Sequence, residues 1–377
     1  MSAPTEPLAP TFAIVTGGGT AGHVLPALAI ADALVRAGHP REAVHFAGAE
    51  RGIEARLVPP TGYPMTLLPG RGIQRKLTLA NLTAIGALVL GFVHAFGLVG
   101  RLQPRVVIAV GGYASAAVGL AAVVRRVPLV VAEQNLVPGA ANRLLGRFAR
   151  ASAVSFPGTP LPRAVVTGNP IRAEITDLAP DRDRGAAKAV FGVDPARRLV
   201  LVVGGSLGAL RINQAAVAAA EIWSDRADLA IHHVVGRRDW DAIAAAPSGS
   251  DAGALERRLV PYEDDMPAAL AAADVAVCRS GSSTCFELAA AGVPAVLVPS
   301  PYVTADQQTG NARHLVDGGA AVLVPDDELD GPRLVAEVDA ILADDGQRAA
   351  MATAARALAR PDAASDIASI AVEHARG

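Results

Sequence analysis

Two distant segments of this chain follow the same plan, and this repetition constrains the fold more than any other feature. In the first, an apolar stretch at residues 11–16 leads into the glycine-rich turn 17–23 (GGGTAGH), and a helical pattern follows. In the second, residues 199–203 lead into the turn 204–208 (GGSLG), again followed by a helical pattern. A strand, a glycine turn and a helix that occur twice predict two similar α/β halves.

Further short apolar runs alternate with helical patterns in both halves. They lie at residues 43–47, 65–68, 105–110, 127–132 and 151–155, and then at 230–235, 275–278, 295–298 and 321–324. Such runs are typical of strands that are buried on both faces of a parallel sheet. Between the halves, residues 173–197 are polar and predict a boundary with a solvated helix. From about residue 332 the chain is Ala-rich and helical.

Composition excludes several classes of protein. Hydrophobic residues make up 51% of the chain and charged residues 19%, which excludes a disordered protein. The net charge of -2 gives no overall attraction for nucleic acid, so we expect no nucleic-acid partner. Cys278 and Cys285 lack the spacing of a metal site, which predicts a buried, reduced pair. The first ten residues lack the pattern of a signal or transit peptide.

Both glycine turns follow strands, at the edge where parallel sheets bind their ligands. Helix N-termini direct free N–H groups outward there, and glycine lets a phosphate approach the backbone. Gly17, Gly19 and Gly22 also satisfy the GxGxxG pattern of dinucleotide enzymes, but the second strand is not closed by the acid that would bind the ribose. An NAD(P)-dependent oxidoreductase or a non-catalytic nucleotide-binding protein is therefore the alternative hypothesis. Tight structural turns are a third interpretation.

The second half contains a more specific pattern, which reads CRSGSSTCFE at residues 278–287 and GVP at residues 292–294. It predicts a strand, a turn rich in hydroxyl groups and a helix with Glu287 in its first turns. Free N–H and hydroxyl groups suit a pyrophosphate, and one carboxylate can accept hydrogen bonds from both hydroxyls of a ribose. The same residues could instead form a helix cap with a capping-box acid.

Taken together, the motifs of this chain resemble the MurG family of glycosyltransferases. The motifs are GGTxGH at 18–23, GGY at 111–113, EQN at 133–135, GNPIR at 168–172, GGSxGA at 204–209, RSG at 279–281 with Glu287, and DQQxxN at 306–311. The resemblance extends from about Ile14 to about Arg360. It implies a GT-B fold, an α/β architecture of two Rossmann-like parallel-sheet domains with a deep interdomain cleft.

The resemblance also implies three segments with different roles. Residues 11–167 would form the N-terminal domain on the acceptor and membrane side, and residues 168–355 the C-terminal domain that binds the UDP-sugar donor. Residues 356–377 would form a final helix that returns toward the N-terminal domain. In the implied reaction, N-acetylglucosamine passes from UDP to the C4 hydroxyl of lipid I with inversion, and lipid II is formed.

Family similarity further implies which residues bind the donor. From the C-terminal half they are Ser206, Glu263 through its backbone, Ser282, Ser283, Thr284, Cys285, Phe286, Glu287 and Gln307, with Gln308 and Asn311 contacting the sugar. From the N-terminal half they are Thr20, Ala21, Gly22, Asn135 and Arg172. In two places the sequence departs from the family pattern. Ala132 stands where relatives often have His, and Glu263 replaces the usual apolar residue whose backbone meets the uracil.

An inverting transfer needs a base for the acceptor proton and a positive environment for the departing UDP. His23, at the end of the first glycine turn, is the candidate base, and a capping or phosphate-contacting histidine is the alternative. Arg172 and the helix N-termini can offset the charge of the leaving group, so we expect neither a metal nor another cofactor. The Asp-x-Asp at residues 181–183 lies in the polar boundary and is interpreted as a solvated charge run.

The segment from residue 77 to residue 100 has no Lys, Arg, Asp or Glu, and Arg75, Lys76 and Arg101 flank it. Its length would suffice for a membrane span, but polar residues and glycines interrupt it and it lies within a βαβ pattern. We expect a partly buried helix that also contacts an anionic membrane surface. The protein would then be peripheral, on the cytoplasmic face of the cell membrane, where other cell-wall synthesis proteins are further candidate partners.

Overall fold

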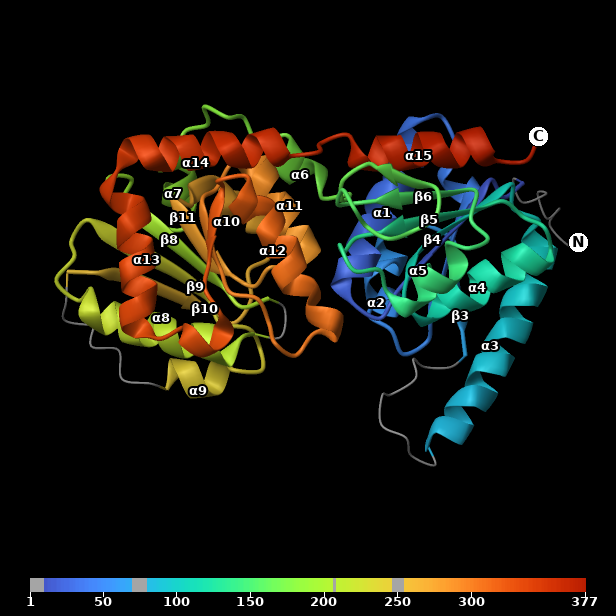
Figure 1. Cartoon of the computed structure of the whole chain (residues 1–377), viewed down its shortest axis with the longest axis horizontal. Helices are drawn as coiled ribbons and strands as arrows, with labels where there is room; N and C mark the ends of the chain where they lie inside the picture. Colours follow the sequence, from blue (N-terminus) through green and yellow to red (C-terminus); the bar gives the residue numbers. More distant parts are fainter. Residues whose placement is uncertain (1–9, 70–79, 206–207, 246–253) are drawn as a thin grey trace, which may run out of the picture. The chain divides into compact units, whose positions relative to one another are not determined.

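The structure is a computed structural model that describes residues 10–69, 80–205, 208–245 and 254–377. The chain divides into two compact units. Unit 1 comprises Met1–Arg172 and Arg360–Gly377, and unit 2 comprises Ala173–Ala359. Each unit contains one parallel sheet covered by helices on both faces (Figure 1). Ser206, one of the predicted donor-binding residues, lies outside the described residues.

The sheet of unit 1 has seven strands in the order β3-β2-β1-β4-β5-β6-β7, and neighbouring strands are parallel. The strands are β1 (Ala13–Gly17), β2 (Val44–Ala49), β3 (Met65–Leu68), β4 (Val106–Gly111), β5 (Leu129–Glu133), β6 (Ala151–Val154) and β7 (Ala164–Val166). The helices are α1 (Ala21–Arg36), α2 (Glu54–Leu57), α3 (Ala80–Leu102), α4 (Tyr113–Val124), α5 (Ala140–Leu145) and α15 (Ala363–His374), with short 3-10 turns at Arg41–Ala43 and Pro59–Thr61.

The central strands of unit 1 are buried along their whole length because each face of the sheet carries its own core. Every residue of β1, β4 and β5 is buried. On one face, Val15 and Ile108 pack with residues of α1 and α15. On the other, Ile14 and Val107 pack with residues of α3 and α4. This two-sided burial explains why the strands are continuous apolar runs.

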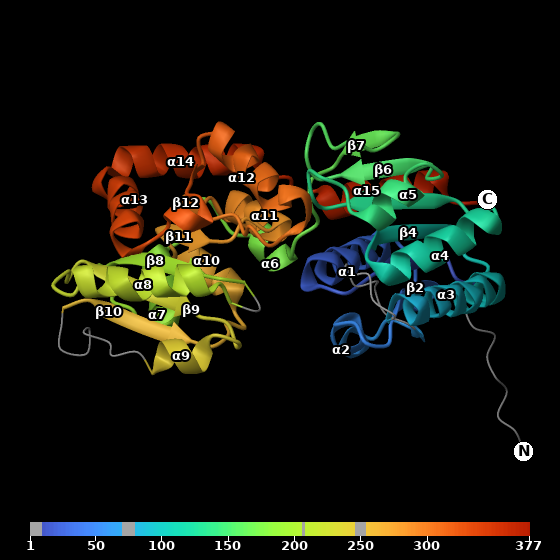
Figure 2. The same ribbon diagram turned by 60° about the horizontal axis from the view of Figure 1, so that its bottom comes forward.

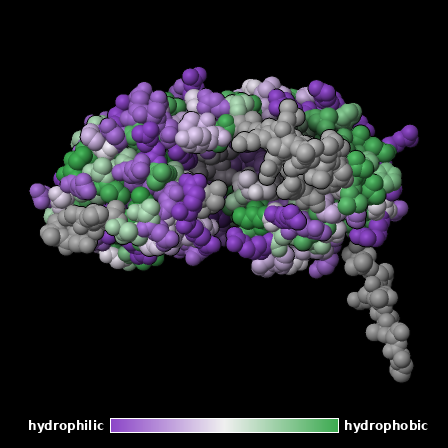
Figure 3. Space-filling view, turned by 90° about the horizontal axis from the view of Figure 1, so that it is seen from below, coloured by the Kyte–Doolittle hydropathy of each residue, from purple (hydrophilic) through white to green (hydrophobic). Residues whose placement is uncertain are grey.

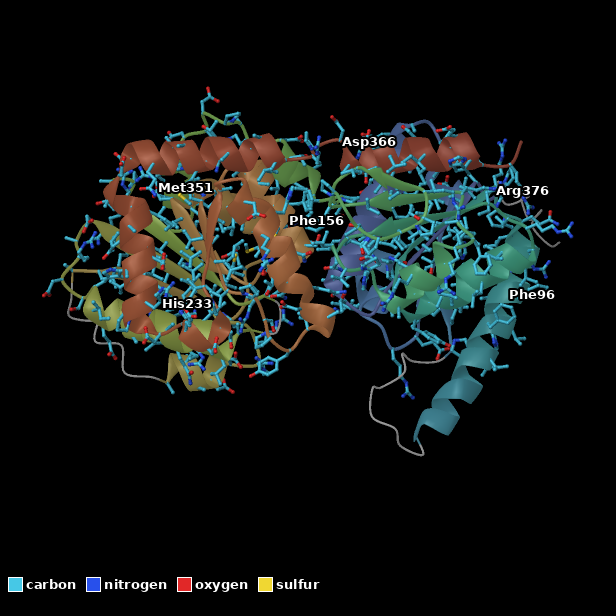
Figure 4. The ribbon with its side chains drawn as sticks, viewed as in Figure 1. Phe96, Phe156, His233, Met351, Asp366 and Arg376 are labelled. Carbon is cyan, nitrogen blue, oxygen red and sulfur yellow. The ribbon has the colours of Figure 1, made fainter. Side chains whose placement is uncertain are left out.

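The last helix of the chain, α15, belongs to unit 1 and packs against α1 (Figure 2). Ala364, Ile367, Ala368 and Ala371 of α15 join the core that contains α1. Beyond α15, Arg376 donates a hydrogen bond to the Arg125 carbonyl at 2.9 Å, while its own carbonyl accepts from Nε of Arg105 at 2.6 Å (Figure 4). The end of the chain is therefore tied to the beginning of β4 and the end of α4.

The sheet of unit 2 has six parallel strands in the order β10-β9-β8-β11-β12-β13. The strands are β8 (Arg198–Val203), β9 (Leu229–Val234), β10 (Glu256–Val260), β11 (Val275–Cys278), β12 (Ala295–Leu297) and β13 (Ala321–Leu323). The helices are α6 (Ala173–Thr176), α7 (Arg184–Val190), α8 (Leu210–Ile222), α9 (Trp240–Ala244), α10 (Met266–Ala272), α11 (Ser282–Ala291), α12 (Gln307–Asp317), α13 (Gly331–Ala343) and α14 (Asp345–Leu358), with 3-10 turns at Thr304–Asp306 and Asp326–Glu328.

The strands predicted from apolar runs are confirmed, with small shifts at their ends. Two further strands were not predicted. The residues of β7 are exposed at the edge of their sheet, and β10, which also forms an edge, contains Arg257 and Arg258. Edge strands of this kind lack the uninterrupted apolar run of a strand covered on both faces. In the polar boundary, the Asp183 side chain caps α7 by accepting a hydrogen bond from the Ala186 N–H at 3.1 Å.

The apolar segment forms α3, although its residues 77–79 lie outside the described part of the chain. Ala95, Leu98 and Val99 are buried against the sheet, whereas Val89, Leu90 and Val93 are exposed. Arg125 holds the buried end of α3, because its guanidinium lies 3.8 Å from the centre of the Phe96 ring and donates to the Phe96 carbonyl at 2.7 Å (Figure 4). Among the described residues, no helix has the length and apolarity that a membrane crossing requires.

Candidate active site

The first glycine turn connects β1 to α1 and fixes the ring of His23. The Nδ1 atom of His23 lies 3.1 Å from the Gly18 carbonyl oxygen and 3.2 Å from the Thr20 hydroxyl. A carbonyl oxygen can only accept, so the proton of the neutral imidazole is assigned to Nδ1. This tautomer leaves the lone pair on Nε2, which is the arrangement that a general base requires.

Gly111 and Gly112, at the end of β4, allow the turn and the histidine ring to pack closely. Both have positive φ angles, of 123° and 90°. A Cβ atom on Gly111 would lie 2.8 Å from Cδ2 and 2.9 Å from Nε2 of His23, and a Cβ atom on Gly112 would collide with the Gly18 carbonyl oxygen. The Gly18 N–H also donates to the Gly111 carbonyl at 3.1 Å. The Gly-Gly pair is therefore required by the position of His23.

Glu133, at the end of β5, organises the loop that contains Asn135. Its carboxylate is 3% exposed and accepts from the N–H of Asn135 at 2.9 Å, from the N–H of Gly139 at 3.0 Å and from Nδ2 of Asn142 at 2.9 Å. Of this motif, only Asn135 was expected from the sequence to lie in the site, and Glu133 was missed. A glutamate at the end of a buried strand was the signal that could have identified it.

Two opposing effects determine the protonation of His23. Burial lowers the pKa of His23 below its ordinary value, whereas the charge of Glu133, the hydrogen bond to the Gly18 carbonyl and the charge of Glu54 raise it. Burial prevails, so the imidazole is neutral at physiological pH and can accept a proton.

The other predicted residues of this unit are Ala21 and Gly22, which begin α1, and Arg172, which is half-buried at the end of the first segment of unit 1.

In unit 2, the second glycine turn lines an open pocket of about 810 Å³. Gly205 and Gly208 have positive φ angles, and the Gly208 N–H donates to the Gly205 carbonyl at 2.9 Å. Arg211, Arg238 and Arg279 also line this pocket. Arg279 is held in place by Asp326 at 2.5 Å and by the Val298 carbonyl at 3.0 Å. Glycine backbone and arginine side chains together form an environment that suits a pyrophosphate.

A second pocket of about 160 Å³ adjoins the first, since Thr284 and Gly205 line both. Its walls are mainly apolar, as a flat nucleobase requires, and Glu287 and Glu263 contribute carboxylates. The remaining wall residues are Leu201, Val203, Val234, Tyr262, Met266, Leu270, Ala276, Cys278 and Leu288. The structure therefore brings Thr284, Glu287 and Glu263 together around one pocket.

The side chain of Glu263 is directed toward a buried histidine. Its Oε2 atom lies 2.8 Å from Nε2 of His232, which is fully buried, and its Oε1 atom accepts from the Asp265 N–H at 2.9 Å. These contacts fix the backbone of the loop that the resemblance assigns to the uracil. The residue that departs from the family pattern thus has a local structural partner.

Three predicted donor-binding residues of α11 and α12 line neither of the two pockets described above. Cys285 and Phe286 are buried in the core, and the N–H of Cys285 already donates to the Gly281 carbonyl. Asn311 is completely buried and donates from Nδ2 to the Ser280 carbonyl at 3.3 Å. This hydrogen bond connects Asn311 to the turn at residues 279–281.

The remaining predicted residues of these helices lie at the helix N-termini, and one of them lines the larger pocket. Gln308 lines it, and its side-chain oxygen accepts from the Ser300 N–H at 2.8 Å. Gln307 is the first residue of α12 and is partly exposed. Ser282 and Ser283 form the first turn of α11 after Gly281, whose extended backbone caps the helix. In the part of the chain that the structure describes, no group of His, Cys, Asp and Glu could hold a metal ion.

The turn that carries His23 in unit 1 and the pockets of unit 2, each on its own parallel sheet, are typical of a nucleotide-sugar glycosyltransferase of the GT-B type, and comparison with known proteins agrees. Residues 13–154 match the glycosyltransferase family 28 N-terminal domain, and residues 199–367 match the glycosyltransferase family 28 C-terminal domain. The chain belongs to the MurG family, the UDP-N-acetylglucosamine--N-acetylmuramyl-(pentapeptide) pyrophosphoryl-undecaprenol N-acetylglucosamine transferases. The alternative of an oxidoreductase has no support from these relatives.

Three relatives illustrate the similarity. The chain is 43% identical over 360 residues to the Salinibacter ruber transferase of this name, with 94% of each chain covered. It is 41% identical to the Alkalilimnicola ehrlichii transferase, with 96% of this chain and 99% of the relative covered. The crystal structure of Acinetobacter baumannii MurG covers 97% of this chain and 100% of its own, with 29% identity and a TM-score of 0.78.

Proposed function

We propose that this chain transfers N-acetylglucosamine from UDP-N-acetylglucosamine to the C4 hydroxyl of lipid I, with inversion, and so forms lipid II for peptidoglycan synthesis. The single observation that best supports the chemistry is the histidine at the first glycine turn. His23 is neutral, and its Nδ1 proton is directed to the Gly18 carbonyl. Its Nε2 lone pair is the group that would take the acceptor proton.

Unit 2 would bind the donor in its two adjoining pockets. The nucleobase fits the smaller apolar pocket, where Glu287 can accept hydrogen bonds from the ribose hydroxyls. The diphosphate fits the larger pocket, next to Gly205, Gly208 and Arg279. Gln307, at the beginning of α12, would contact UDP, and Gln308 and Asn311 of the same helix would contact the sugar.

In the proposed step, the acceptor C4 oxygen forms a bond to the anomeric carbon while its proton passes to Nε2 of His23. The bond from the anomeric carbon to the diphosphate breaks, and UDP leaves with the electron pair. Arginine side chains and backbone N–H groups stabilise the charge on the departing UDP. Arg172 would contribute to this stabilisation, and Thr20, Ala21, Gly22 and Asn135 would contact the donor from unit 1.

We also propose that the protein lies peripherally on the cytoplasmic face of the cell membrane. Figure 3 shows hydrophobic surface gathered on unit 1, and the exposed apolar residues there include Val89, Leu90, Val93 and Val124. A membrane-anchored acceptor makes such a surface useful, because an apolar helix face can enter the boundary between headgroups and acyl chains. Flanking basic residues would attract anionic lipid, and other cell-wall synthesis proteins would be neighbours there.

The transfer assay tests the proposal directly. Labelled N-acetylglucosamine supplied as UDP-N-acetylglucosamine should be incorporated into a lipid I analogue with a chelator present. In a parallel melting experiment, UDP and UDP-N-acetylglucosamine should raise the melting temperature, whereas NAD(P) should not. Stabilisation by NAD(P) alone, with no transfer to the analogue, would overturn the assignment.

Vesicle flotation tests the membrane contact separately. The protein should float with vesicles that contain anionic lipid at low salt and detach at high salt, because screening weakens surface electrostatics. Val93→Ser should float less well than the native protein and retain UDP binding, since Val93 lies on unit 1 and is exposed. Equal flotation of the two proteins would exclude this face of α3 as the contact.

A further inference from the structure

Glu54 is a buried carboxylate beneath the first glycine turn, and it belongs to none of the motifs that identify the family. It begins α2, shortly after β2 ends, and is 1% exposed. Its Oε2 atom accepts from the Gly19 N–H at 2.9 Å, and its Oε1 atom accepts from the Ala49 N–H at 2.9 Å. Among the described residues, no Lys, Arg or His forms an ion pair with it. Burying a carboxylate without an ion pair lowers the stability of the fold, which suggests that Glu54 has a role in the site.

The backbone around Glu54 is shaped to hold the carboxylate. A Cβ atom on Gly18 or on Gly52 would collide with its carboxyl group, and a Cβ atom on Gly48 would collide with its Cγ atom. Gly48 lies in β2, Gly52 in the following loop and Gly18 in the first glycine turn. Three segments of backbone therefore approach the same side chain at positions where only glycine fits.

This arrangement links Glu54 to His23 in two ways. Glu54 fixes the Gly19 amide, and the preceding residue, Gly18, supplies the carbonyl that accepts the Nδ1 proton of His23. Glu54 also acts through its charge, because it raises the pKa of His23 against the effect of burial. The charged groups that act on His23 are Glu133, from the end of β5, and Glu54, from the start of α2.

We propose that Glu54 is a positioning residue for His23: it holds the glycine turn in the shape that orients the imidazole, and its negative charge stabilises the imidazolium that forms during transfer. This inference rests on the proposed role of His23 as the base. The proton moves from the acceptor hydroxyl to Nε2, and the negative charges of Glu133 and Glu54 favour the positive charge that results. Fixed charges that oppose developing charge act most strongly in a site that excludes water.

Two substitutions separate the charge of Glu54 from its shape. Glu54→Gln keeps the shape and removes the charge, whereas Glu54→Asp keeps the charge and shortens the reach. Glu50→Gln is the matched control, because Glu50 lies only four positions earlier in the chain but is exposed to solvent. The full-length proteins are titrated by NMR, and the His23 imidazole signals are assigned by their loss in His23→Gln.

The expected result is a titration midpoint for His23 that lies at lower pH in Glu54→Gln than in the native protein, because loss of a nearby negative charge disfavours the imidazolium. Glu50→Gln and Glu54→Asp should leave the midpoint close to the native value. In Glu54→Gln, kcat should fall about tenfold, the acid limb of its pH profile should move to lower pH, and the dissociation constant for UDP should not change. An unchanged His23 midpoint in folded Glu54→Gln would overturn the proposal.

One measurement needs no substitution and remains available if Glu54→Gln does not fold. The carbon-13 chemical shift of the Glu54 carboxyl group in the native protein at neutral pH should be that of the ionised form, and a protonated carboxyl would overturn the proposal. Failure of the proposed function is a distinct outcome. If His23→Ala retained normal turnover, the base assignment would fail, while the effect of Glu54 on the His23 titration would still be measurable.

Discussion

The two glycine turns have the same position in their sheets but very different surroundings. The first turn, at residues 17–22, contacts the buried carboxylate of Glu54 and packs closely against Gly111 and Gly112. His23 follows the turn directly. In the second turn, Gly204, Gly205 and Gly208 line an open pocket together with three arginines. The same strand-turn-helix unit can therefore orient a reactive side chain in one half and offer its backbone to an anionic ligand in the other.

The largest expected effect tests the first turn. Replacing His23 by Ala removes the base, and general base catalysis typically contributes about 10²–10⁴-fold, so kcat should fall by that order. UDP binding should be unchanged because the donor pockets lie in unit 2. Steady-state kinetics and calorimetric UDP titration measure the two quantities. Turnover near the native value would remove the chemical role of the first turn.

The next effect tests the second half. Replacing Glu287 by Gln removes the charged acceptor for the ribose hydroxyls, and a hydrogen bond to a charged group contributes about 1.5–3 kcal/mol. The dissociation constant for UDP should therefore rise roughly 10- to 100-fold. Glu221→Gln is the matched control, since Glu221 is an exposed acid on α8 of the same unit. A normal UDP affinity in Glu287→Gln would mean that Glu287 serves only the helix.

A smaller effect concerns the support of the first turn. Gly112→Ala combines an unfavourable positive φ with a collision against the Gly18 carbonyl. Backbone strain of this kind costs about 1–3 kcal/mol, so the melting temperature and kcat should both fall. Gly38→Ala is the control, because Gly38 has a φ of 98° but an added Cβ would meet no atom within 4 Å. If both variants lost the same stability and neither lost activity, close packing of the turn would not matter for catalysis.

The smallest effect is on pH dependence. Because burial lowers the pKa of His23, its imidazole stays neutral, and active as a base, to lower pH than an ordinary histidine with a pKa of 6.5 would. The acid limb of the profile of kcat/KM against pH should therefore lie below pH 6.5. A limb above that value would mean that another group controls activity, or that His23 must be protonated for activity.

Much of the fold could be predicted from the sequence because the central strands are covered on both faces. Continuous apolar runs such as β4 and β8 then mark the sheet directly. Two of the edge strands could not be predicted in this way, because β7 has only three residues, all exposed, and β10 contains two consecutive arginines. Such edge strands depend on pairing with a neighbour rather than on burial of their own side chains.

Site residues that lie in a local sequence motif could be predicted. Whether a side chain points into the site or into the core could not. The turn that carries His23 and the helix that carries Glu287 could be located from glycines and hydroxyl residues. The burial of Phe286 and Asn311 could not, since it depends on which side of a helix meets the core. Glu54 left no signal at all, because its partners are backbone N–H groups at residues 19 and 49.

In the proposed mechanism, the first turn serves the chemistry and the second serves donor binding. The most direct test is the single-turnover rate of transfer to a lipid I analogue, measured for His23→Ala and Glu287→Gln over a range of donor concentration. A high concentration of UDP-N-acetylglucosamine should restore the rate of Glu287→Gln but leave His23→Ala slow, if this division of roles is correct. Restoration of His23→Ala by added donor would contradict it.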